Sequence, residues 1–122
     1  DFLAYHDHNF ADAEKFYQQS IALEEHSHAY NNYGCVLVKR TQVEAARTPK
    51  WEMNENMASY MERAETCFKQ ALKMDRKANS THLRNYAFFL QEFKKGGNSV
   101  AIADKARTLF FLADKVDSIQ DS

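Results

Sequence analysis

The chain has 122 residues, enough for one small domain and too few for two cores of useful size. It contains only three glycines and one proline, so few positions oppose a helix and the composition favours an all-α fold. Sixteen basic and seventeen acidic residues give a net charge of −1, which provides no field for holding a polyanion, so no nucleic-acid partner is expected.

Helical periodicity extends along almost the whole chain and predicts about five helices and no strand. The final turns of one helix at 1–6 are followed in chain order by five helices: one near 12–24, one from Ser27, one ending at Asp75, one over 80–95 and one after Gly96-Gly97. The predicted N-caps, whose side chains would accept hydrogen bonds from the first turn, are Ser27, Ser80 and Asn98.

Two patterns repeat along the chain. Residues 30–37 and 83–90 share Asn-Tyr followed by a small residue, a place where a neighbouring helix can approach closely. A second pattern, small-x3-aromatic-x2-small-x2-apolar-acid, begins at Ala13, Ala64 and Ala106. Its spacings put the small and aromatic residues on one helical stripe, which favours packing against another helix. The repetition indicates stacked helical hairpins.

With these motifs the chain resembles the tetratricopeptide repeat family, whose hairpins of about 34 residues carry such residues at matching positions. The resemblance covers nearly all of the chain outside about 41–57. It implies one domain over 1–122, an α-α superhelix or solenoid of about two and a half repeats. The expected repeats are a truncated one at 1–25, a second at 27–75 and a third at 79–117.

The second repeat is longer than the family pattern by a segment near 41–58. Apolar residues keep helical spacing on both sides of Thr48-Pro49, so we expect two lengthened helices that form a hairpin, with Thr48 as N-cap of the second. Trp51 lies near the expected tip. Two interpretations are open for it: an anchor for a partner, or a side chain folded back over the hairpin.

In the family, the first helices of the hairpins line a concave groove that binds other proteins. Counting from the motifs, the groove residues implied here are Tyr5, Asn32, Lys39, Arg84, Asn85 and Phe88. Lys39 and Arg84 would attract a partner segment of some acidic character. The amide of Asn32 or Asn85 would contact the backbone of that segment, or alternatively bond to the neighbouring hairpin.

Other chemistry finds little support in the sequence. His6-Asp7-His8 and His26-Ser27-His28 place imidazoles two residues apart, on different sides of a helix, so no metal site is expected. No nucleophile elbow or phosphate loop is present, and we expect no enzyme activity and no cofactor. Cys35 and Cys67 lack metal-ligand spacing and are expected to be reduced thiols.

The sequence therefore predicts a protein-interaction module in the cytoplasm. No apolar run approaches the roughly 20 residues that cross a bilayer, and no membrane contact is expected. The alternatives are an architectural segment of a larger scaffold, or a regulatory appendage of an enzyme elsewhere in the chain. The last helix carries Leu109-Phe110-Phe111-Leu112 and is apolar on more than one side, which predicts that Phe111 or Leu112 is covered by a partner, a following segment or, through self-association, another copy.

Overall fold

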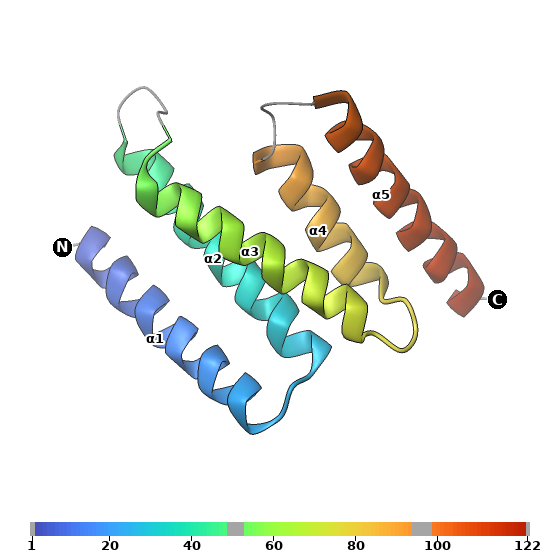
Figure 1. Ribbon diagram of the computed structural model, residues 1–122, viewed down its shortest axis with the longest axis horizontal. Helices are drawn as coiled ribbons and strands as arrows, with labels where there is room; N and C mark the ends of the chain where they lie inside the picture. Colours follow the sequence, from blue (N-terminus) through green and yellow to red (C-terminus); the bar gives the residue numbers. More distant parts are fainter. Residues whose placement is uncertain (1, 49–52, 94–98, 122) are drawn as a thin grey trace.

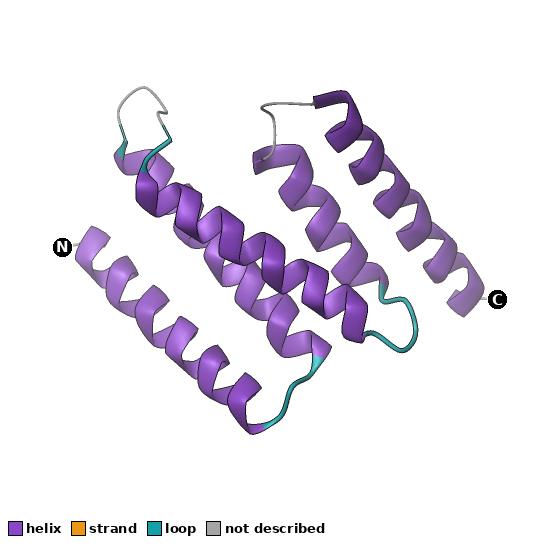
Figure 2. Ribbon diagram, viewed as in Figure 1, coloured by secondary structure: helices purple, strands orange, loops and turns teal. Residues whose placement is uncertain are grey.

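A computed structural model describes residues 2–48, 53–93 and 99–121, with only the backbone described for 2–8, 99, 120 and 121. Over these residues the chain forms helices and connecting turns, without a strand (Figure 2). The helices are α1 (Phe2–Leu23), α2 (Ser27–Arg47), α3 (Glu55–Met74), α4 (Ser80–Phe93) and α5 (Ser99–Asp121). The prediction of an all-α chain with about five helices is confirmed.

The helices lie side by side along one common direction, with α1 and α5 at opposite ends of the array (Figure 1). The hairpin of α2 and α3 forms the most extensive helix pair, and α1 packs on α2 at one side of it. On the other side α4 contacts both α2 and α3, and α5 packs on α4. Each helix thus contacts its neighbour in sequence, and α2 also contacts α4.

The N-terminal segment differs from the prediction. We expected a helix to end near His6 and another to begin near Asp12, whereas α1 runs without interruption from Phe2 to Leu23. The expectation was wrong because nothing between His6 and Asp12 breaks a helix. Neither glycine nor proline occurs there, and residues such as Asp and Asn only modestly oppose helix propagation once a helix has formed.

Helix occupies most of the predicted insertion. α2 continues to Arg47 and α3 begins at Glu55, so lengthened helices are found there, as expected. Thr48 does not cap α3, however. It ends α2, where its hydroxyl donates to the Glu44 carbonyl at 2.9 Å, and Asn54 caps α3 by accepting from the Met57 N–H at 2.8 Å. Pro49 and Trp51 lie outside the described residues.

The other predicted caps are displaced by one residue. His26 Nδ1 accepts from the Ala29 N–H at 3.2 Å, so His26 precedes α2 and Ser27 is its first helical residue. Asn79 Oδ1 accepts from the His82 N–H at 3.0 Å and caps α4 in place of Ser80. An imidazole nitrogen or an amide oxygen can accept a hydrogen bond from the same first-turn N–H group as a serine hydroxyl. The serine caps were predicted only from the general preference for serine at the N-cap position. Asn98 is outside the described residues.

The repeated Tyr-small motif lies in the core. The Phe68 ring packs so closely on Gly34 that a Cβ atom there would come within 2.8 Å of the ring. Phe68 is itself stacked near Tyr86, with 6.1 Å between ring centroids, and near Phe89, at 5.6 Å. Ala87, which follows Tyr86 as Gly34 follows Tyr33, is fully buried. The small residue admits a neighbouring helix, as the motif predicts.

A buried carboxylate joins α1 to the α2–α3 hairpin. Glu14 accepts from Arg40 Nη1 of α2 at 2.7 Å and from Arg63 Nη2 of α3 at 2.8 Å. Arg63 also donates to the Tyr33 hydroxyl at 2.6 Å, and the Arg40 guanidinium lies 4.6 Å from the centroid of the Tyr60 ring. This cluster links three helices by charge, and no sequence pattern indicated it.

Candidate partner-binding groove

A polar seam joins α2 to α4. His28 Nδ1 and His82 Nε2 lie 3.1 Å apart, and one turn further along Asn85 Nδ2 donates to Asn31 Oδ1 at 3.1 Å. The other ring nitrogen of His82 lies 2.9 Å from the Asp75 carboxylate. His82 and Asn31 are buried, so these contacts satisfy groups that water does not reach. We call these five residues the α2–α4 seam.

Next to the seam a depression opens between α2 and α4. Its volume is about 290 Å³, and its walls combine apolar side chains with two amides and one ammonium group. It is lined by Cys35, Val38, Lys39 and Gln42 of α2, Phe68 of α3, and Asn85 and Phe88 of α4. We call it the α2–α4 pocket. Phe88 is 45% exposed, a large fraction for an aromatic ring inside a helical array.

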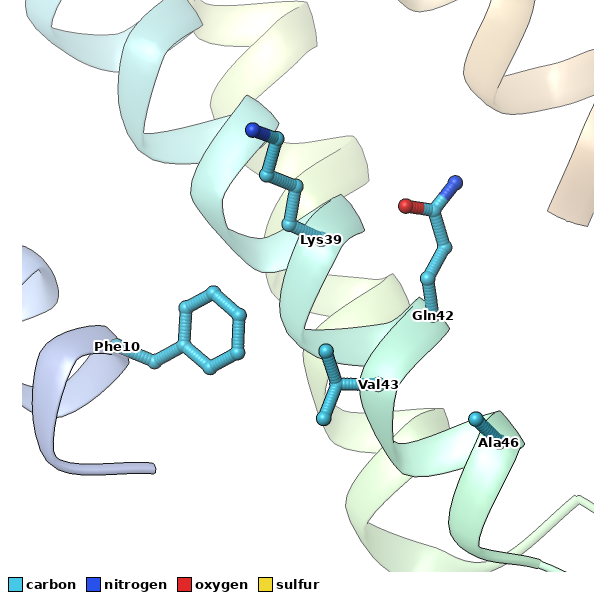
Figure 3. A pocket seen from close by; sticks show the side chains of 5 residues that line it. All are labelled: Phe10, Lys39, Gln42, Val43 and Ala46. Carbon is cyan, nitrogen blue, oxygen red and sulfur yellow. The ribbon is translucent and has the colours of Figure 1, made fainter. Parts of the chain in front are cut away.

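A second depression lies on the other side of α2, toward α1, with a volume of about 450 Å³. It is lined by Phe10 of α1 and by Lys39, Gln42, Val43 and Ala46 of α2. Figure 3 shows the Phe10 ring extending from α1 toward Val43, with Lys39 and Gln42 projecting from successive turns of α2. We call this the α1–α2 pocket.

The two pockets adjoin, because Lys39 and Gln42 line both of them. We refer to the two pockets together, from Phe10 on α1 to Phe88 on α4, as the groove across α2. Its lining from α2 recurs at 35, 38, 39, 42, 43 and 46, the spacing of a single helical face. The lengthening of α2 supplies the last part of that face.

Electrostatically the groove has one positive group on a largely apolar surface. Among the described residues that line the two pockets, Lys39 is the only charged one. Burial raises the pKa of the neighbouring Cys35 thiol, and the positive charge of Lys39 opposes that rise without cancelling it. Cys35 is therefore mainly a neutral thiol in the pocket wall near neutral pH.

Of the predicted groove residues, Lys39, Asn85 and Phe88 lie together in the α2–α4 pocket. Asn32 is exposed on α2 and lines neither pocket. For Asn85 two roles were open, and the structure has the bond to the neighbouring hairpin, through Asn31. The side chain of Tyr5 and the whole of Trp51 lie outside the described residues.

Arg84, the second cation predicted to hold a partner, points to α5. Its guanidinium donates to Asp117 at 2.6 Å and to Asp114 at 3.0 Å, and it lines neither pocket. These hydrogen bonds raise the pKa of Arg84, and bonds from Ser80 and Arg84 lower the pKa of Asp117. The positive charge of Arg84 is thus matched within the array, and Lys39 is left as the cation of the groove.

Sequence reasoning missed Phe10 as a groove residue, because the helix containing it was expected to be interrupted. It also did not assign Val43 and Ala46 to the groove, although their helical spacing with Lys39 and Gln42 was visible. That spacing was the signal that could have identified them. It does not give the position of α1, which packs beside this face of α2 and makes it a pocket wall.

The last helix also exposes apolar side chains. On α5, Phe111 is 60% exposed and Leu112 is 44% exposed, as expected for a surface that a partner or a second copy would cover. Asp114, close by, is one of the two carboxylates bound to Arg84. Coverage of this face remains a prediction.

Two further features bear on function. Within the described parts of the chain, His, Cys, Asp and Glu side chains nowhere gather in a group of three or more that could hold a metal ion. Within the same residues, no helix has the length and apolar character needed to cross a membrane. Comparison of the chain with protein-family models, curated proteins and solved structures gave no match. Any functional inference therefore depends on the structure itself.

Proposed function

We propose that this chain is a protein-interaction module, and that it binds a segment of a partner protein in the groove across α1, α2 and α4. One observation carries the proposal: two adjoining, mostly apolar pockets share Lys39 and Gln42 at their common border. A ligand that fills both must be elongated and must present more than one side chain. A peptide segment has this form, and grooves between helices commonly bind one.

The helical scaffold supports the same function. The pocket walls are side chains on helices whose spacing is held by the α2–α4 seam and by the Glu14 cluster, so little rearrangement is needed before binding. The order of helix contacts, with α2 touching both α3 and α4, suits stacked hairpins of the tetratricopeptide type. We infer such a superhelix. Cys35 and Cys67 are free thiols, which suits the reducing cytoplasm.

A second candidate function is supported by a different observation. Phe111 and Leu112 form an exposed apolar site on α5, away from the groove, and such a site suits a chain that is one segment of a larger scaffold. In that case the contact that matters would be α5 against another subunit, and the groove would be a consequence of helix packing.

The test begins with a random peptide library selected on the immobilised chain, followed by affinity measurement on the enriched peptides by fluorescence anisotropy. Gln42→Trp places a large ring at the border of the two pockets and should weaken binding at least about tenfold, equivalent to about 1.4 kcal/mol. Gln19→Trp, on an exposed position of α1 outside both pockets, is the matched control and should bind as the parent does.

Far-UV circular dichroism should show unchanged helix content in both variants. Enriched peptides that bind Gln42→Trp as tightly as the parent would contradict the groove proposal. If the same peptides were released by Phe111→Ser instead, the architectural candidate would be favoured.

A further inference from the structure

The chemistry of the groove identifies the kind of segment that would fill it, provided that the groove is the binding site proposed above. Among its described lining residues, none carries a carboxylate and one carries an ammonium group, that of Lys39. The remaining polar side chains are the amides of Gln42 and Asn85, which are neutral. A carboxylate placed in the groove would meet attraction and no repulsion from the pocket walls.

Lys39 also forms no ion pair within the described part of the chain. Arg40, the next residue, is held by Glu14, and Arg84 is held by Asp114 and Asp117. Lys39 makes no ion pair with a described residue and its side chain is exposed. Lys39 also lines both pockets, so its ammonium group lies at their common border.

The apolar surface lies on both sides of this ammonium group. Phe10, Val43 and Ala46 line the α1–α2 pocket on one side. Val38 and Phe88 are apolar walls of the α2–α4 pocket on the other, where nearly half of the Phe88 ring is open to solvent. Each pocket can bury one apolar side chain, and covering Phe88 would add favourable apolar contact.

We propose that the groove recognises a protein segment in which one acidic residue lies between two apolar residues. The carboxylate pairs with Lys39 at the border, and one apolar side chain enters each pocket. The acidic residue must lie between the two apolar residues, because the two pockets lie on opposite sides of Lys39. A segment with a basic residue in the central position would be rejected by repulsion from Lys39.

The probe is the enriched peptide pool from the random library described above. The pool should be dominated by sequences with Asp or Glu between two apolar residues. For one such peptide, a double-mutant cycle combines Lys39→Gln in the protein with Glu→Gln in the peptide. Each single change should weaken binding about twofold to fivefold, and the second change should add little once the first is made, because both remove one ion pair.

A charge exchange gives a stricter measurement. Lys39→Glu should reverse the preference, so that a peptide with Lys in the central position binds better than the original. Lys73→Glu, on an exposed position of α3 outside both pockets, makes the same change of net charge and should leave the preference intact. The effect of Lys39 should also shrink when salt is raised, since an exposed pair is screened.

Cys35 reports occupancy independently of affinity. In a Cys67→Ala background, alkylation of Cys35 in the α2–α4 pocket should slow when the peptide is saturating. An unchanged alkylation rate would show that the peptide binds elsewhere, and both proposals would fall. Peptides that protect Cys35 and are sensitive to Gln42→Trp, yet bind equally well with Glu or Gln in the centre, would overturn the acidic preference and leave the groove as the binding site.

Discussion

The close contact between Gly34 and Phe68 allows a sharp test of the packing. In Gly34→Ala the new methyl group would lie 2.8 Å from Cε1, 2.9 Å from Cζ and 3.0 Å from Cδ1 of the Phe68 ring. These distances are shorter than van der Waals contact, so the ring or the helix must move. The ring is 1% exposed and lies against Tyr86 and Phe89, which leaves it little space to move into.

Two opposing effects determine the size of the change. Alanine is better than glycine in the middle of a helix by about 1 kcal/mol. Forcing an extra methyl group into a filled core costs about 1–3 kcal/mol. Because Phe68 is confined by two aromatic rings, we expect a steric cost in the upper part of that range, about 2–3 kcal/mol, and so a net loss of about 1–2 kcal/mol in the free energy of unfolding. For a chain of this size, that corresponds to a fall in Tm of about 3–10 °C.

Urea and thermal unfolding followed by far-UV circular dichroism measure this loss. The control is the same substitution in a Phe68→Leu background, which removes the ring atoms that the methyl group would meet. There Gly34→Ala should be neutral or stabilising by up to about 1 kcal/mol. A Gly34→Ala variant as stable as the parent, or an equal penalty in both backgrounds, would refute the inferred contact.

Three other predictions concern the charged cluster, a buried thiol and the last helix. Glu14→Gln should lower the free energy of unfolding by about 1–3 kcal/mol, because two guanidinium groups lose the carboxylate that they share. The control is Asp104→Asn, in an exposed ion pair, which should change the free energy of unfolding by less than about 0.5 kcal/mol. Equal effects of the two substitutions in urea unfolding would contradict the role of the cluster. Burial raises the pKa of Cys67 to about 11, so the folded chain keeps a proton that the unfolded chain loses above its ordinary pKa near 9. Stability should therefore fall by about 1–3 kcal/mol between about pH 9 and pH 11, and Cys67→Ala should flatten that slope; an unchanged slope would show that other groups cause it. Sedimentation should detect concentration-dependent association of the parent chain, and the double substitution Phe111→Ser and Leu112→Ser should abolish it. A parent chain that stays monomeric at high concentration, with no other protein bound to α5, would count against the prediction.

Much of the fold was predictable because it depends on short-range periodicity. The Asn-Tyr-small motif correctly indicated where helices approach closely, at Gly34 and Ala87. In the stripe that begins at Ala64, Phe68 and Ala71 are also buried in α3. In the stripe that begins at Ala106, Ala113 is buried in α5 and Phe110 is partly buried. Continued helical spacing beyond the motif also predicted the long α2 and α3. In each case the signal lies within a few turns of a single helix.

The features that escaped prediction depend on residues distant in sequence or on competing local choices. Arg84 was expected to face a ligand, but its partners lie on α5, about thirty residues later, and no local pattern specifies them. Phe10 belongs to a pocket because α1 continues past the point where a break was expected. The caps were displaced since histidine, asparagine and serine can all accept the same first-turn hydrogen bond.

The α2–α4 seam has a consequence for how the hairpins align. Helices with similar apolar stripes can pack in several offsets, because one apolar side chain replaces another at little cost. In the seam, His82 faces His28 and Asn85 faces Asn31, with equal spacings of three residues on both helices. A slip of α4 by one turn would break both contacts, and in one direction it would place Phe88 opposite the buried Asn31 amide, which would lose its partner at about 1–3 kcal/mol. The seam thus favours one offset of α4 along α2, and this offset sets the distance between Phe88 and Lys39.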